Sequence, residues 1–281
     1  MLVTTNKMLA DAAKGGYAVG AFNAENDEMV WGIAMAAQEL NAPVIIQTTS
    51  STLKHLGPAY FVGAVKAAAK HANVPIALHL DHGSSYELAA ECIECGYTSV
   101  MIDGSMLPFA ENLELATKVS EYAKKFNIPV EAELGTIGGK EDATVSASSM
   151  YTNPKEAADY AQQSGISSLA ISIGTAHGFY AVAPKLDLTR ITDIKSLVNV
   201  PLVMHGASGI ADETVREAAK LGMAKVNFAT ELRVAFSDAI RKYLAENPSE
   251  YDPKKYLGEA RLAVKKLVMH KIKVCGSDAK A

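Results

Sequence analysis

The sequence predicts a closed (β/α)8 barrel, the TIM-barrel architecture, with an extra C-terminal helix. Short runs rich in Val, Ile and Leu alternate with helical segments along the chain. The runs are apolar throughout, which is typical of parallel strands buried on both faces. Eight such units in roughly 200 residues fit a closed barrel, whose usual size is about 250 residues. An open, doubly wound sheet is less favoured because no GxGxxG follows the first strand.

The expected strands are short apolar runs, and they lie at 17–22, 43–48, 75–80, 98–103, 128–134, 167–174, 200–206 and 224–230. Apolar residues recur at helical spacing between many of them, at 26–40, 59–72, 84–96, 111–126, 154–165 and 211–222. Several of these segments close on glycine, as helices commonly do. One more helix is expected at about 252–275, and we expect residues 1–281 to form a single domain.

Composition restricts the classes of partner. With 49% apolar residues in 281, the chain can bury a large core. The net charge is −4 and the basic residues are scattered, so we expect no nucleic acid and no membrane as partners. Neither a signal peptide nor 18 uninterrupted apolar residues is present, which favours a cytoplasmic protein acting on small molecules. Cys92 and Cys95 form a CxxC inside a helical pattern, where a structural role is favoured over metal or redox chemistry.

Unusual polar residues cluster at the carboxyl ends of the expected strands. The loops that follow the strands build the site in barrels of this kind, so scattered residues converge if the barrel closes. The residues at these ends are Asn23, Asp81, His82, Asp103, Glu131, Glu133, His177, His205 and Asn227.

Three of these residues are histidines beside glycine, in DHG, AHG and MHG. A single histidine after a strand is commonly a hydrogen-bonded structural residue. Three on one rim favour a metal site, because three protein ligands and a free position are the catalytic zinc arrangement. The ligands would be His82, His177 and His205, with His79, inside a strand, as a reserve.

Two glycine-rich loops follow the sixth and seventh expected strands. GTAHG (174–178) and HGASG (205–209) can expose backbone N–H groups as an anion-binding nest. Each loop alone could be a tight turn without a ligand. Two loops beside VNFAT (226–230) favour a phosphate site, and phosphate commonly binds near the last strands of such barrels.

The motifs LHLDHGSS, SVMIDGS, VEAELGTIGGKED, IGTAHG, LVMHGASGI and KVNFATEL, in this order, resemble the class II, metal-dependent fructose- and tagatose-bisphosphate aldolases. The resemblance covers essentially the whole chain. The variants GTAHG and NFATEL and the ending KIKVCGS lean slightly toward the tagatose branch. The implied partners are sugar phosphates and the implied assembly is a homodimer or homotetramer.

The resemblance also implies roles for individual residues. His82, His177 and His205 would hold Zn²⁺, with Glu133 as a neighbour to which the metal can shift or which orients a ligand. Asp81 would be the acid/base on the C4 hydroxyl where the carbon–carbon bond breaks. Asn227 would bind the dihydroxyacetone part, and Gly178, Gly206, Ser208 and Thr230 its phosphate, with a monovalent cation, Na⁺ or K⁺, nearby. The remaining candidate substrate ligands are Asn23, Thr49 and Arg261.

The long segment 136–153 is implied to carry the second proton-transfer group. Glu141 would be the proton carrier for the enediolate carbon, and Lys140 replaces an acidic residue without moving Glu141 out of register. Connections of this length without obvious periodicity are commonly functional lids or disordered surface loops, and Gly138 with Gly139 offers a hinge. We therefore predict a loop that is mobile without substrate and closes over the reacting carbon.

The chemistry favours a metal over a Schiff base. Cleavage between C3 and C4 leaves a carbanion that Zn²⁺ on the ketose oxygens can stabilise as a Lewis acid. Lys225 is the one lysine in the expected strands, and it stands at the beginning of its strand rather than at the catalytic end. Two alternatives remain open: a zinc hydrolase, although the first strand has no HxH, and a non-catalytic metal-binding partner subunit.

Overall fold

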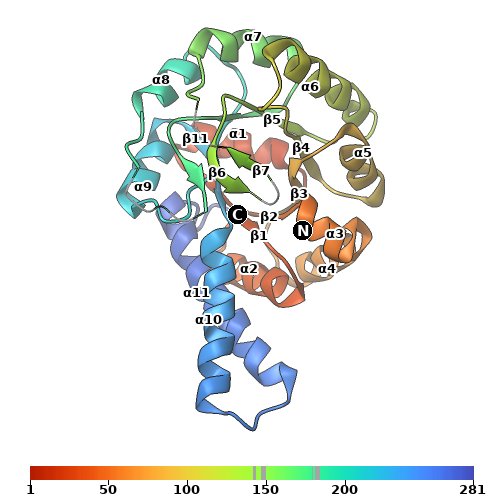
Figure 1. Ribbon diagram of the computed structural model, residues 1–281, viewed down its shortest axis with the longest axis vertical. Coiled ribbons are helices and arrows are strands. Elements are labelled where there is room, and N and C mark those ends of the chain that lie inside the picture. Colours follow the sequence, from red (N-terminus) through yellow and green to blue (C-terminus); the bar gives the residue numbers. More distant parts are fainter. Residues whose placement is uncertain (142–143, 147–149, 179, 181–183) are drawn as a thin grey trace.

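The barrel is closed by eight parallel strands (Figure 1). The computed structural model describes the chain except residues 142–143, 147–149, 179 and 181–183, and between 140 and 146 it describes the backbone alone. Around the barrel the order is β1-β11-β10-β8-β5-β4-β3-β2. The strands are β1 (Val19–Asn23), β2 (Val44–Thr49), β3 (Ile76–Gly83), β4 (Ser99–Ile102), β5 (Val130–Leu134), β8 (Ser168–Ile171), β10 (Leu202–Met204) and β11 (Met223–Phe228).

The prediction of a closed barrel is confirmed, and each expected strand overlaps an observed one. Closure is direct, because β1 pairs in parallel with β11 on one side and with β2 on the other. The apolar content of the strands has its expected cause: their outer faces pack under helices in one large buried cluster. All eight carboxyl ends therefore open at the same end of the barrel.

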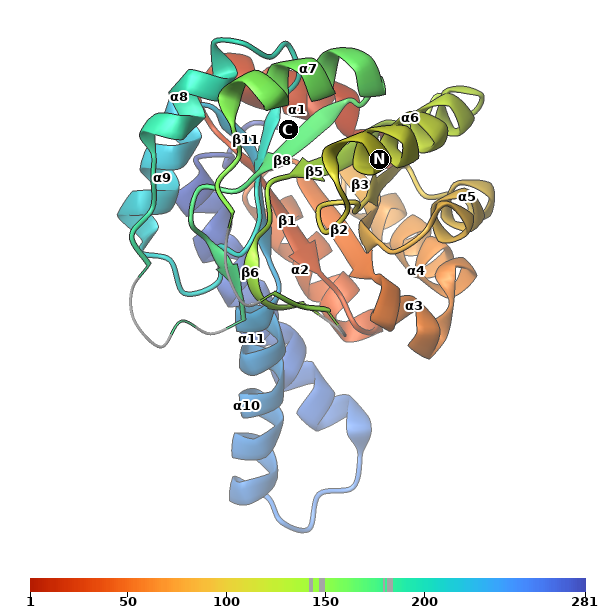
Figure 2. The ribbon, with the colours of Figure 1, turned by 45° about the horizontal axis from the view of Figure 1, so that its top comes forward.

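Helices surround the strands (Figure 2). Local sequence fixes several starts: Asn26 accepts a hydrogen bond from the N–H of Met29, and Ser85 accepts one from the N–H of Leu88. The helices are α2 (Asp27–Glu39), α3 (Ser50–Leu56), α4 (Pro58–His71), α5 (Tyr86–Cys95), α6 (Phe109–Lys124), α7 (Pro154–Ser164), α8 (Thr189–Lys195), α9 (Asp212–Leu221), α10 (Thr230–Glu246) and α11 (Pro253–Cys275).

The floor of the barrel is closed by α1 (Thr5–Gly15), a helix that the periodicity analysis did not single out. Its residues Met8 and Leu9 are buried against Val19, Ile45 and Ala77 in a second apolar cluster inside the barrel. The floor is therefore largely apolar, whereas the carboxyl end is polar. This contrast leaves the carboxyl end as the entrance to the barrel interior.

The expected C-terminal helix is present as α11, which packs against α2 and α10. Gly32 of α2 allows this packing, since a Cβ there would lie 3.0 Å from the carbonyl oxygen of Arg261. Together α10 and the start of α11 form a helical hairpin that extends beyond the barrel (Figure 1). No helix in the described part of the chain is long and apolar enough to cross a membrane.

A small sheet lies beside the barrel entrance, in the order β7-β6-β9. It joins β6 (Gly138–Glu141) and β7 (Thr144–Ser146), which are antiparallel, to β9 (Ala176–His177), which is parallel to β6. The segment 136–153, which we predicted to be a mobile lid, contains the two short strands β6 and β7, and its mobility stays a prediction. These short strands form because the backbone of β6 pairs with that of β7 and β9, and no alternation of apolar side chains marks them in the sequence.

Candidate metal centre and active site

The three glycine-flanked histidines meet at the carboxyl end of the barrel. His82 lies on β3, His177 on β9, and His205 directly follows β10. One ring nitrogen from each lies within 4.8 Å of the others. Nε2 of His82 and Nδ1 of His205 are 2.8 Å apart. The first and last of these histidines are more than a hundred positions apart in the sequence, and the structure brings all three together, as expected.

The backbone at His82 explains how two consecutive residues face one site. Along a regular strand Asp81 and His82 would point to opposite faces. His82 instead has φ +47°, and the pairing of β3 with β4 shifts register between Leu80 and Gly83. Such irregularities redirect a side chain and are concentrated at functional sites. Gly83 permits the close approach, because a Cβ there would lie 2.2 Å from the carbonyl oxygen of Met101.

Two carboxylates orient the imidazole rings of His82 and His205. Oδ2 of Asp103 lies 2.7 Å from Nδ1 of His82, and Oε1 of Glu131 lies 2.9 Å from Nε2 of His205. Metal-binding histidines commonly donate their second ring N–H to a carboxylate in this way. The remaining nitrogens, Nε2 of His82 and Nδ1 of His205, turn toward each other at the entrance. The donor set fits a divalent metal such as zinc.

The pKa values of His205 and His82 are shifted in opposite directions. Burial lowers the pKa of His205 well below its usual value, and the charges of His82 and Lys225 lower it further. His205 is therefore neutral, the form that binds a metal. Burial acts in the same direction on His82, but the neighbouring carboxylates of Asp81 and Asp103 outweigh it and raise the pKa of His82 well above its usual value.

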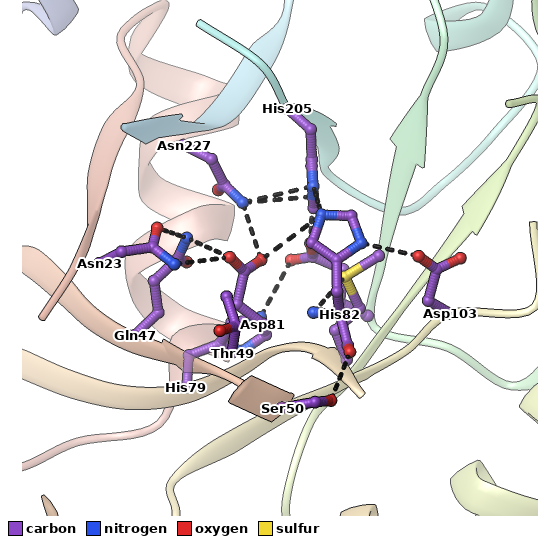
Figure 3. Close-up of polar contacts among 12 residues, drawn as sticks. Asn23, Gln47, Thr49, Ser50, His79, Asp81, His82, Asp103, His205 and Asn227 are labelled. Carbon is purple, nitrogen blue, oxygen red and sulfur yellow. Dashed lines mark hydrogen bonds and ion pairs between the residues drawn. The ribbon is translucent and has the colours of Figure 1, made fainter. Parts of the chain in front are cut away.

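Asp81 is held by three amide side chains at the centre of the site (Figure 3). Its Oδ2 accepts hydrogen bonds from Nδ2 of Asn23 at 2.9 Å and Nε2 of Gln47 at 3.0 Å. Its Oδ1 accepts from Nδ2 of Asn227 at 3.0 Å. Burial raises the pKa of Asp81, but the positive charge on His82, the charge of Lys225 and the hydrogen bond from Asn23 outweigh it, so the pKa lies below its usual value. The result is a fixed, ionised carboxylate beside the histidines.

Gln47 was missed by the sequence reasoning. It is fully buried and also donates to Oδ1 of Asn23 at 2.8 Å, so it links two strand ends. The available signal was the polar Gln47 inside the apolar run PVIIQT. Like Asn23 and Asp81, it lies near the carboxyl end of its own strand.

Glu133 lies in a second cluster of possible ligands, with His82 and Asp103. It is buried, and its Oε2 has no hydrogen-bond partner among the residues that the structure describes. Burial, followed by the charge of Asp103, raises the pKa of Glu133 well above its usual value. An unpartnered buried oxygen is costly, which fits the expectation that Glu133 offers a neighbouring position to a metal.

The two glycine-rich loops contact each other beside the histidines. The hydroxyl of Tyr180 accepts from the N–H of Ala176 and donates to the carbonyl oxygen of Gly206, both at 2.7 Å. Gly206 has φ +65°, and a Cβ there would lie 2.6 Å from the carbonyl oxygen of Ala176. A small cavity opens between the loops and the site, lined by Asn23, Asp81, His82, His177, Gly178, Gly206, Ser208, Asn227, Ala229 and Thr230.

A second cavity, of about 380 Å³, lies on the other side of His82 and His177. Ser51, Lys54 and Ser105 contribute polar groups to it. The two cavities share the histidine pair, so a molecule bound at the histidines can extend in both directions.

Some predicted site residues lie elsewhere. Thr49 is buried at the start of α3, where its hydroxyl lies 3.1 Å from those of Ser51 and Thr52. Arg261, on α11, pairs with Glu28 of α2 at 3.3 Å. Neither is among the described residues that line the two cavities. His79, the reserve ligand, lies deeper in the barrel, and the side chain of Glu141 on β6 is outside the described part.

Comparison with known families decides the relationship. The model of the family described as fructose-bisphosphate aldolase class-II matches residues 3–280. The chain belongs to this family. The resemblance inferred from the motifs is thereby confirmed: the family is one of metal-dependent aldolases, and the histidine cluster of this chain fits a metal.

Solved structures agree with this assignment. The YdjI aldolase from Escherichia coli K12 is 36% identical, with a TM-score of 0.89 and coverage of 100% of both chains. A protein from Coccidioides immitis described as a possible fructose-1,6-bisphosphate aldolase is 28% identical, with a TM-score of 0.88 and coverage of 98% of this chain and 96% of that one. The fructose-bisphosphate aldolase of Campylobacter jejuni, 23% identical, shares the fold with a TM-score of 0.85 over 100% of this chain and 97% of its own.

Proposed function

We propose that this class II aldolase reversibly cleaves a ketose 1,6-bisphosphate, tagatose- or fructose-1,6-bisphosphate, to dihydroxyacetone phosphate and glyceraldehyde 3-phosphate. The observation that carries the proposal is the position of Asp81, an ionised carboxylate fixed by three amides directly beside three converging histidines. A proton acceptor and a metal site next to each other are what cleavage beside a ketone needs.

His82, His177 and His205 are proposed to hold Zn²⁺. Bound there, the ion would supply Lewis-acid stabilisation of the negative charge that develops on the ketose oxygens. Asp103 and Glu131 keep the His82 and His205 rings in orientation for it. Glu133 is proposed to offer the alternative ligand position.

Asp81 is proposed to accept the proton of the C4 hydroxyl as the C3–C4 bond breaks. The electron pair of that bond remains on the dihydroxyacetone half, and the C4 oxygen becomes the aldehyde oxygen. Glu141 is proposed to deliver the proton to C3 that completes the product. Its place on β6, which pairs with the strand of His177, is consistent with delivery from that side.

The phosphate of the dihydroxyacetone half is proposed to bind in the cavity between the glycine-rich loops. Gly178 and Gly206 bring the backbone close, Ser208 and Thr230 add hydroxyl groups, and Asn227 and Asn23, which line the same cavity, would lie beside the sugar oxygens. A monovalent cation, Na⁺ or K⁺, is proposed nearby. The aldehyde half would then extend into the 380 Å³ cavity on the opposite side.

Purified protein assayed with tagatose- and fructose-1,6-bisphosphate side by side tests the proposal. We expect cleavage of at least one, with the motif variants favouring tagatose. Absence of cleavage of both sugars by zinc-loaded protein would overturn the proposed activity. Homodimeric or homotetrameric assembly and a cytoplasmic location remain predictions from the sequence.

A further inference from the structure

Lys225 is a fully buried cation beneath the candidate metal centre, and the proposed reaction does not use it. It lies on β11, inside the barrel. Its Nζ is 2.9 Å from both carboxylate oxygens of Glu131 and 3.5 Å from Nε2 of His79. The three donors of the ammonium group thus have three acceptors, and none of them remains for a substrate.

Glu131 connects this cation to a metal-site histidine. The Oε1 atom that Lys225 contacts also lies 2.9 Å from Nε2 of His205. An ionised carboxylate paired with an ammonium group can only accept hydrogen bonds. His205 must therefore carry its proton on Nε2, which leaves the lone pair on Nδ1, the nitrogen that faces His82.

The ion pair of Lys225 and Glu131 is also contacted from the barrel floor, by His79. Burial, and then the charge of Lys225, lowers the pKa of His79 well below its usual value, so this ring is neutral. Its Nδ1 lies 2.8 Å from Oγ of Ser99, which in turn accepts from the hydroxyl of Thr5 on α1. Buried polar contacts thereby join α1, on the barrel floor, to His205 at the entrance.

A buried ion pair commonly adds little to the stability of a protein, because apolar residues of similar volume at the same positions often give equal or greater stability. We propose that Lys225 is a positioning residue: it holds Glu131 so that this carboxylate fixes the ring and the tautomer of His205, with Nδ1 presented to the metal. The inference rests on the metal-binding role of His205 in the proposed function, but not on the identity of the sugar.

Zinc affinity of the metal-free protein, measured by competition with a chromophoric chelator, tests the proposal through three variants. Lys225→Met removes the ammonium group, and we expect zinc to bind about 10- to 100-fold more weakly, the usual effect of losing support behind a metal ligand. The double variant Lys225→Met with Glu131→Leu buries no charge. We expect its thermal stability to recover relative to Lys225→Met while its zinc affinity remains weak.

Lys271→Met is the matched control. Lys271 is also buried and paired with carboxylates, 3.0 Å from Glu231 and 3.6 Å from Asp212, but it contacts none of the three histidines. We expect this variant to lose thermal stability and to keep its zinc affinity within about twofold. If Lys225→Met does not fold, the zinc affinities of the double variant and of Lys271→Met still test the proposal.

Histidine-selective ¹⁵N NMR of the metal-free protein supplies a readout that a purely structural role would not move. The His205 signals, assigned with His205→Asn, should show a protonated Nε2 in the wild type and lose this single tautomer in the double variant. Wild-type zinc affinity in the double variant, or an equal loss in Lys271→Met, would overturn the proposal. Failure of the wild type to cleave either ketose bisphosphate would overturn the proposed activity and leave these zinc and NMR results unaffected.

Discussion

Gly139 of β6 is paired in parallel with His177 of β9, so the hinge of the predicted lid lies directly beside the strand that carries a candidate metal ligand. Gly139 has φ +96°, and a Cβ there would lie 2.3 Å from the carbonyl oxygen of His177. We predict that Gly139→Ala displaces β9 and weakens zinc binding at least tenfold, as measured by chelator competition. Gly63→Ala, on α4 with open space around the added Cβ, is the control and should change neither affinity nor fold. Unchanged zinc affinity in Gly139→Ala would show that β6 does not support His177.

The metal centre gives a second prediction. A chelator should abolish cleavage and Zn²⁺ should restore it, and alanine at His82, His177 or His205 should each reduce zinc content, because three ligands hold the ion. His71, whose ring packs on Trp31 away from the site, serves as the control position, and His71→Ala should change little. Full activity after exhaustive chelation would contradict the zinc mechanism.

Asp81 should be separable from the metal. Asp81→Ala is expected to keep zinc and fold while cleavage falls about 10²- to 10⁴-fold, the usual contribution of a general acid/base group. Zinc content by metal analysis and cleavage rate should be measured on the same preparation. A parallel fall in both quantities would mean that Asp81 supports the metal rather than moving the proton.

Glu141 gives a fourth prediction, on proton transfer at carbon. Glu141→Ala should slow the exchange of the C3 proton of dihydroxyacetone phosphate with solvent far more than it weakens the binding of zinc or substrate. The measurement is loss of that proton signal by NMR in deuterated buffer. If exchange continues at the wild-type rate, the proton carrier lies elsewhere, with Glu133 as the next candidate.

The sequence alone determined the barrel and most of its entrance. Eight apolar runs separated by helical segments require parallel strands covered on both sides, and strand carboxyl ends then share one rim. A shared rim predicts that Asn23, Asp81, His82, His205 and Asn227 lie together, and the structure brings them to one site. The identity of a strand-end residue is a local property, so it can be read without knowing any contact.

Tertiary structure decided what depends on contacts between distant residues. The positive φ of His82 arises where β3 meets β4, and the pairing of Lys225 with Glu131 depends on the register around the closed barrel. No local pattern reports either one. Thr49 was a candidate substrate ligand, and the structure places its hydroxyl at the start of α3, 3.1 Å from the hydroxyl of Thr52. Polarity at a strand end places a side chain near the rim, whereas its partners are decided by which groups the closed barrel brings within hydrogen-bonding distance.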